Sequence, residues 1–81
     1  MKKYINVIIN FVACKVEYEF YIATSLTLFE NLQLILNIID YCIAKQYQNE
    51  LIITNQAKEY LDINLEVATL NLYDGIQLNV Y

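Results

Sequence analysis

The chain opens with two segments in which apolar and polar positions alternate. Over residues 5–11 the odd positions are Ile, Val, Ile and Phe, whereas two of the three even positions are Asn. In residues 16–22, Val, Tyr, Phe and Ile alternate with Glu, Glu and Tyr. A period of two is typical of a strand with one buried face. Because only residues 13–15 separate the two segments, they are predicted to pair as a hairpin.

The next segment has the spacing of an amphipathic helix. Thr27 and Glu30 have the S/T-x-x-E spacing of a capping box, in which each side chain accepts a hydrogen bond from the other residue's amide. The apolar spacing from residue 28 predicts about fifteen residues of helix that cover the hairpin. The apolar stripe consists of Leu28, Phe29, Leu32, Ile35, Leu36, Ile39, Cys42 and Ile43.

Three apolar residues of the predicted helix lie outside this stripe. At 100° per residue, Leu34, Ile38 and Tyr41 fall together on the opposite side. They are either exposed residues or residues covered by the neighbouring loop, or they form a second contact surface for a partner. This surface and the eight tyrosines also lead us to expect self-association into a homodimer.

The segment after the helix predicts short elements. Residues 44–50 are polar and are interpreted as a linker. Residues 51–54 are rich in β-formers and end at Asn55-Gln56, where Asn tolerates a left-handed turn. Residues 57–61 predict a brief edge strand, and residues 62–65 predict a turn with buried apolar side chains.

The chain closes with a third clear alternation. Asp74-Gly75 is the strongest turn signal, and after it Ile76, Leu78 and Val80 alternate with polar residues. The predicted order is β-β-α-β-(β)-β in one domain, 1–81, of α+β class with a mixed sheet and one helix across one face. The right-handed crossover rule places the strand after the helix and the final strand on the far side of the first strand from its hairpin partner.

Composition argues against catalysis. The chain has no His, so Ser25, Cys14 and Cys42 have no imidazole base, and Gly75 is the only glycine. We therefore expect no enzyme, no catalytic residue and no cofactor. Two cysteines 28 positions apart, without His, also predict no metal site.

Charge argues against nucleic acid as a partner. Five Lys against nine Asp and Glu give a net charge of −4, and only Lys2 and Lys3 are adjacent. A phosphate-binding surface needs clustered basic residues, so no nucleic-acid contact is expected. Glu17 and Glu19, spaced i, i+2, are interpreted as the solvated face of a strand.

Two interpretations of the first residues stay open. The longest uncharged stretch, Tyr4 to Cys14, has eleven residues, below the about 18 that a transmembrane helix needs. The opening MKKYINVIINFVAC resembles a bacterial lipoprotein signal, which would make the chain an exported or lipid-anchored protein processed at Cys14. Asn6 and Asn10 interrupt its apolar segment. Without such a signal, the protein is expected in the reducing cytoplasm with free thiols.

The element order and the final third resemble the ubiquitin β-grasp fold. In LIITNQAKEYLDINLEVATLNLYDGIQLNVY a strand, a turn, a short edge strand and a Leu-containing loop precede the closing strand. Leu70 lies six, eight and ten positions before Ile76, Leu78 and Val80, as a buried aliphatic does in the ubiquitin pattern. The resemblance covers the whole chain, but its motifs are aliphatic spacings that many β-grasp proteins share.

Two departures from ubiquitin carry functional expectations. The sequence ends at Tyr81 without the Gly-Gly tail of the ubiquitin-type modifiers, so conjugation and sulfur-carrier chemistry are not expected. The residues matching the outer-face recognition patch of ubiquitin are Ile8, Ile52, Gln77 and Asn79, of which half are polar.

These features together resemble the YukD-like family of Gram-positive bacteria, whose members accompany type VII secretion systems as cytoplasmic accessory proteins. The resemblance implies a non-catalytic module that binds a protein partner, such as a secretion-apparatus subunit. The alternative that it leaves open is a ubiquitin-like module of an unrelated complex.

Overall fold

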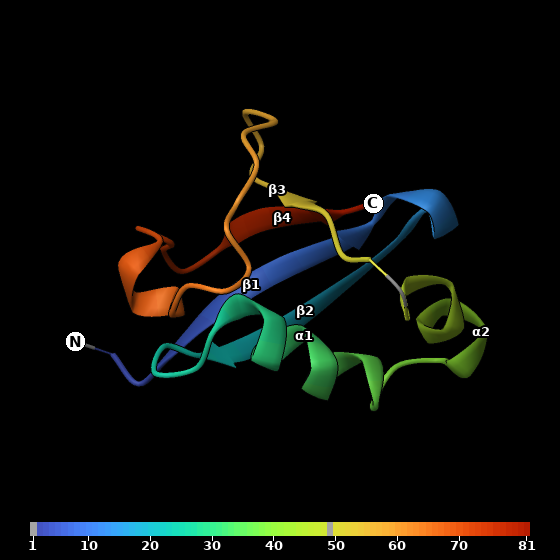
Figure 1. The fold of residues 1–81 in the computed structure, drawn as a ribbon, viewed down its shortest axis with the longest axis horizontal. Helices are drawn as coiled ribbons and strands as arrows, with labels where there is room; N and C mark the ends of the chain where they lie inside the picture. Colours follow the sequence, from blue (N-terminus) through green and yellow to red (C-terminus); the bar gives the residue numbers. More distant parts are fainter. Residues whose placement is uncertain (1, 49) are drawn as a thin grey trace.

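The two alternating segments form the predicted hairpin. In the computed structural model, which describes residues 2–48 and 50–81, strand β1 (Tyr4–Phe11) pairs antiparallel with strand β2 (Val16–Ala23) (Figure 1). A 3-10 turn at Val12–Cys14 joins them and ends at Lys15, whose φ of 56° is left-handed. A φ of 56° lies in the small left-handed region that residues other than glycine can adopt, so the turn forms without a glycine.

The described residues form one mixed sheet with the strand order β2-β1-β4-β3. Strand β4 (Ile76–Val80) lies parallel to β1, and the two-residue strand β3 (Ile53–Thr54) lies antiparallel to β4. Both later strands therefore lie beyond β1 from β2, as the crossover rule predicts. Gly75, with a φ of 87°, lies in the turn directly before β4, as the turn signal indicated.

The core lies between one face of this sheet and helix α1 (Leu28–Leu36), which crosses it (Figure 1). The alternate residues of β1 and β4 supply the sheet side, and the helix supplies Leu28, Leu32 and Ile35. The fully enclosed residues include Val7, Ile9, Phe11, Leu28, Leu32, Leu78 and Val80. The predicted α+β class and the apolar face of the sheet are thus confirmed.

The predicted helix of about fifteen residues is wrong in length. The capping box is present, since the Thr27 hydroxyl accepts from the Glu30 amide and the Glu30 carboxylate accepts from the Thr27 amide, both at 3.0 Å. However, α1 ends at Leu36, and a second helix, α2 (Tyr41–Ala44), follows after a turn. The Asp40 carboxylate accepts from the Cys42 amide at 2.8 Å and starts this new helix, because Asp competes with backbone carbonyls for amide donors.

Two residues of the predicted apolar stripe are not buried. Phe29 is 40% exposed and Cys42 is exposed, although both belong to the predicted buried stripe. Both cysteines are free thiols, and Cys14 is half-buried.

The interpretation of residues 44–50 as a linker is also wrong for most of its length. Ala44 ends α2, and Lys45–Tyr47 forms a 3-10 turn. The Tyr47 side chain is 97% buried, with its ring centroid 5.0 Å from that of Phe11. Burial raises the pKa of its phenol, and its hydroxyl has no hydrogen-bond partner among the described residues. Asn49, within this predicted linker, and Met1, within the predicted signal, lie outside the described residues.

Residues 57–61 do not form the predicted edge strand. They belong to a tight turn that returns to β3 through a single bridge between Thr54 and Tyr60. The left-handed residue of this turn is Lys58 (φ 62°) rather than Asn55. The next predicted turn is present, with the Asp62 carboxylate accepting from the Asn64 amide, but Leu65 is 44% exposed and not buried.

Candidate functional site

The sheet face opposite α1 carries the predicted outer-face residues. Strand pairing places Ile8 between Glu19 of β2 and Gln77 of β4. Asn10 and Asn79 form the next row. Ile8, Gln77 and Asn79 are half-buried, and Ile52 is 39% exposed. The structure therefore brings three of these four residues together in adjacent rows of the sheet, with Ile52 beside β3.

Side-chain amides form a network in the middle of this face. The Oδ1 atom of Asn79 accepts from Asn10 Nδ2 at 3.2 Å and from Gln77 Nε2 at 3.3 Å. The Nδ2 atom of Asn79 donates to the Asn55 carbonyl at 3.4 Å, which ties the network to the turn after β3. These mutual bonds hold the central amides in place, so this part of the face presents a fixed polar surface.

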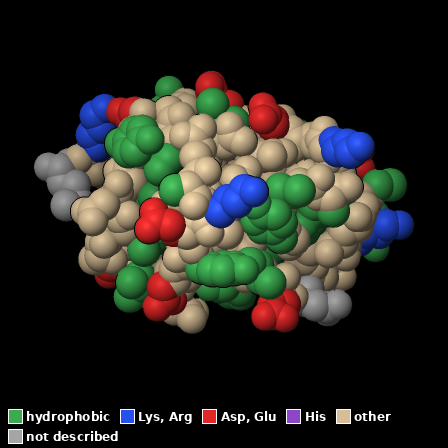
Figure 2. Space-filling model, turned by 90° about the horizontal axis from the view of Figure 1, so that it is seen from above, with side chains coloured by type: hydrophobic (Ala, Val, Ile, Leu, Met, Phe, Trp, Pro, Cys, Tyr) green, Lys and Arg blue, Asp and Glu red, His purple; other side chains and the backbone are tan. Residues whose placement is uncertain are grey.

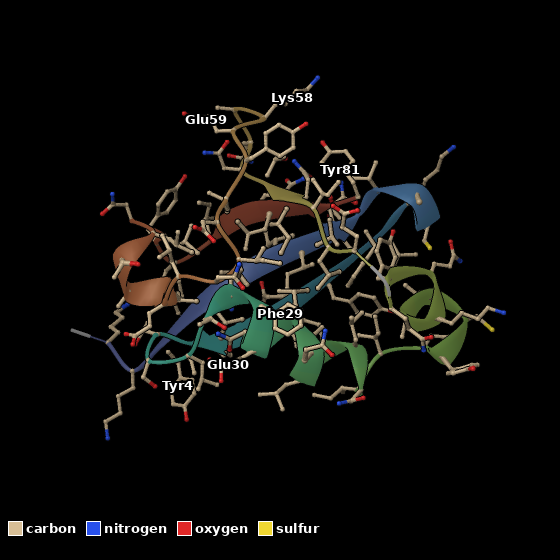
Figure 3. The ribbon with its side chains drawn as sticks, viewed as in Figure 1. Tyr4, Phe29, Glu30, Lys58, Glu59 and Tyr81 are labelled. Atoms are coloured by element: carbon tan, nitrogen blue, oxygen red, sulfur yellow. The ribbon has the colours of Figure 1, made fainter. Side chains whose placement is uncertain are left out.

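An apolar hollow lies at the β3 end of the sheet. It has a volume of about 330 Å³ and is lined by Ile52, Thr54, Lys58, Tyr60 and Tyr81. Figure 2 looks onto this end of the molecule from above and shows hydrophobic side chains gathered around a lysine. In Figure 3, Lys58 and Glu59 lie at the tip of the turn, and Tyr81 lies beside β3.

The turn that carries Lys58 is held by one side chain. Asn55 Oδ1 accepts from the Ala57 amide at 2.9 Å and from the Glu59 amide at 3.0 Å, while Asn55 Nδ2 donates to the Glu59 carboxylate. Loop amides fixed in this way keep Lys58 and Tyr60 beside the hollow. The hollow combines exposed aromatic rings with one cation, a combination suited to a protein contact.

Sequence reasoning missed the part of the hollow that Tyr60 and Lys58 form. The sequence predicts an edge strand for residues 57–61, so it does not place Tyr60 and Lys58 beside Ile52. The signal that could have placed them is Asn55, an Asx-turn residue followed by a short polar segment.

The second predicted surface is not a helix face. Leu34, Ile38 and Tyr41 are 55%, 71% and 72% exposed, as a contact surface requires. They lie in α1, in the turn after it and in α2 respectively, because the helix ends at Leu36. The i, i+4, i+7 argument that grouped them therefore fails, although each remains an exposed apolar residue.

A second hollow, of about 390 Å³, lies near the start of β1 and the loop before β4. Lys2 and Asp74 line it and form an ion pair, and the Asp74 carboxylate also accepts from the Asn6 amide at 2.9 Å. The hydrogen bond from Lys2 lowers the pKa of Asp74, and the same bond raises the pKa of Lys2. The pair joins the ends of two strands that are neighbours in the sheet.

Within residues 2–48 and 50–81, no group of three or more His, Cys, Asp or Glu side chains is placed to hold a metal ion. In the same part of the chain, neither helix has the length and apolar character to cross a membrane. No family model matches the chain, and no curated protein matches it.

Proposed function

We propose that this chain is a ubiquitin-like β-grasp module that binds a protein partner, and that it serves as a cytoplasmic accessory component of a bacterial type VII secretion system. The partner contact in this proposal is the outer sheet face with the apolar hollow at its β3 end. Its residues are Ile8, Ile52, Gln77 and Asn79 from the sequence, and Lys58, Tyr60 and Tyr81 from the structure.

The topology supports the fold part of the proposal. A hairpin, a helix across one face, and a last strand parallel to the first at the centre of the sheet are the features of the β-grasp arrangement. The assignment to the secretion system rests on the sequence resemblance alone.

The exposed apolar hollow is the observation that carries the binding part. Tyr60 is 79% exposed and Tyr81 45% exposed, and they border the hollow with Ile52. Aromatic side chains that stay exposed around a shallow hollow are enriched at protein interfaces, because a partner removes their surface from water.

The alternative of an exported or lipid-anchored protein processed at Cys14 conflicts with this fold. Cleavage before Cys14 would remove β1, which pairs with both β2 and β4 and supplies Val7, Ile9 and Phe11 to the core. The remaining residues would keep no central strand.

A capture experiment in the native host tests the proposal. The chain carries a tag and is cross-linked in cells, and co-purified proteins are identified by mass spectrometry. Ile52→Lys places a charge in the hollow. Leu65→Lys is the matched control, because Leu65 is 44% exposed, close to the 39% of Ile52, and does not line the hollow. We expect the wild type and Leu65→Lys to capture a secretion-apparatus subunit, and Ile52→Lys to lose it.

Either of two results would contradict the proposal. One is that the wild type enriches no secretion component. The other is that Ile52→Lys captures the same subunit in the same yield as the wild type.

A further inference from the structure

The two edge strands of the sheet differ in how they are shielded from pairing with a further strand. At the β3 edge the chain folds back, because Leu61 N donates to Ile53 O and Thr54 bridges to Tyr60. At the other edge, β2 is eight residues long and, within the part of the chain that the structure describes, pairs only with β1. Its residues include no Pro and no Lys, which are common means of preventing further pairing.

Four residues of β2 direct their backbone N–H and C=O groups away from the sheet. Antiparallel pairs alternate between residues that face the partner strand and residues that face away. The amide of Thr24 donates to Lys3 O, so Ile22 and every second residue before it face β1. Ala23, Tyr21, Glu19 and Glu17 therefore face outwards.

One of these outward positions is already filled from α1. Asn31 Oδ1 accepts from the Ala23 amide at 2.8 Å, and Asn31 Nδ2 donates to the Ala23 carbonyl at 3.0 Å. The side-chain amide thus occupies the place that a neighbouring strand would take. The segment Glu17–Tyr21 of β2 therefore remains available to pair with an added strand.

The side chains of β2 define what this edge would accept. Glu17 and Glu19 are exposed on the outer face of the sheet. On the helix side, Tyr18 and Phe20 are only half-buried, with their rings 5.9 Å apart. An added strand with basic residues on one side and apolar residues on the other would pair with the carboxylates and cover these rings.

A second copy of the chain fits poorly. Antiparallel pairing of two β2 strands over this segment would bring Glu17 and Glu19 of one copy close to the same residues of the other, on the same face. Like charges across two strands oppose pairing, and each copy carries a net charge of −4.

We propose that the β2 edge binds an extended partner segment in which Lys or Arg alternates with apolar residues, by adding it as a strand along Glu17–Tyr21. This inference rests on the proposed role as a protein-binding module and adds a contact separate from the hollow. The Lys or Arg side chains of the segment pair with Glu17 and Glu19 on the outer face of the sheet. Its apolar residues pack on Tyr18 and Phe20 on the helix side.

The probe is a synthetic peptide that alternates Lys and Val over about nine residues, the length that covers this strand. Backbone amide signals and their hydrogen exchange are followed by NMR. We expect the Glu17, Glu19 and Tyr21 amides to exchange fast in the free protein and to become protected with the peptide. A peptide of the same composition with its order shuffled is the control.

Two variants separate backbone pairing from charge. Glu19→Pro removes one outward N–H while leaving the groups that face β1, and should weaken binding about fivefold. Replacing Glu17 and Glu19 together by Lys should weaken binding of the Lys-Val peptide about three- to tenfold and allow a Glu-Val peptide to bind instead. The double Lys variant changes only two exposed side chains and leaves the core intact. The test therefore does not depend on whether Glu19→Pro folds.

Three results would overturn the inference: equal binding of the shuffled peptide, protection at amides outside β2, or no change of preference in the double Lys variant. Failure here is distinct from failure of the proposed function. A host partner that is lost with Ile52→Lys but kept with Glu19→Pro would refute the edge contact and leave the module assignment standing.

Discussion

Replacing Asn31 by Ala should cost this small domain a large share of its stability. Asn31 is 4% exposed and makes three hydrogen bonds, with Ala23 N, Ala23 O and Thr27 O, at 2.8 to 3.0 Å. Alanine removes all three and leaves the backbone groups of Ala23 unpaired near the core. No other side chain among the described residues bonds both of these groups.

The expected loss of unfolding free energy follows from typical energies of hydrogen bonds and of helix propensity. A hydrogen bond contributes about 1 kcal/mol net, so the three account for about 3 kcal/mol. The higher helix propensity of alanine offsets about 0.5 kcal/mol of this. The expected loss of about 2.5 kcal/mol compares with a total of about 4 to 12 kcal/mol for a chain of this length. At about 4 °C or more per kcal/mol, the melting temperature should fall by at least about 10 °C.

Urea unfolding followed by far-UV circular dichroism measures this loss. Asn37→Ala is the matched control, because Asn37 is exposed at the end of α1 and its side chain has no hydrogen bond among the described residues. That variant should stay within about 0.5 kcal/mol of the wild type. A loss below about 1 kcal/mol for Asn31→Ala would refute the role assigned to its amide.

Three further predictions concern the cap, the ion pair and self-association. Thr27→Ala should lower the free energy of unfolding by about 1 kcal/mol, measured in urea, and an unchanged midpoint would contradict the capping box. Because Lys2 lowers the pKa of Asp74, the pair's stabilisation is present above the ordinary carboxyl value of 3.8 and is lost as the pH falls through the lower folded-state pKa. Asp74→Asn should therefore flatten the dependence of the urea midpoint on pH in this range, and an identical profile would speak against the pair. Light scattering should show the wild type self-associating and the variant with Leu34→Lys and Ile38→Lys monomeric; a wild type that stays monomeric at high concentration would refute this.

The strands and the start of the helix could be predicted because their signals are local. A period of two requires only that one face of a strand be buried, and β1, β2 and β4 carry it without interruption. Thr27 and Glu30 satisfy each other's amides within one turn, whatever lies around them.

The end of α1 and the hollow were harder to predict. Apolar spacing continues past Leu36, where α1 ends. The Asp40 carboxylate then accepts from the Cys42 amide and starts α2, and Tyr47 packs beside Phe11 of β1. The hollow requires Ile52 and Tyr81 to meet through the pairing of β3 with β4.

The sequence by itself determined which faces of the chain are apolar, where the hairpin turns and where the helix begins, because each of these depends on neighbouring residues. The tertiary structure decided which of the exposed and polar groups gain partners. Asn31 is an ordinary polar residue on a helix until the edge of β2 lies beside it, and its two bonds to Ala23 exist only because the fold places that edge there. Burial and pairing between distant residues are properties of the packed chain, and no local pattern encodes them.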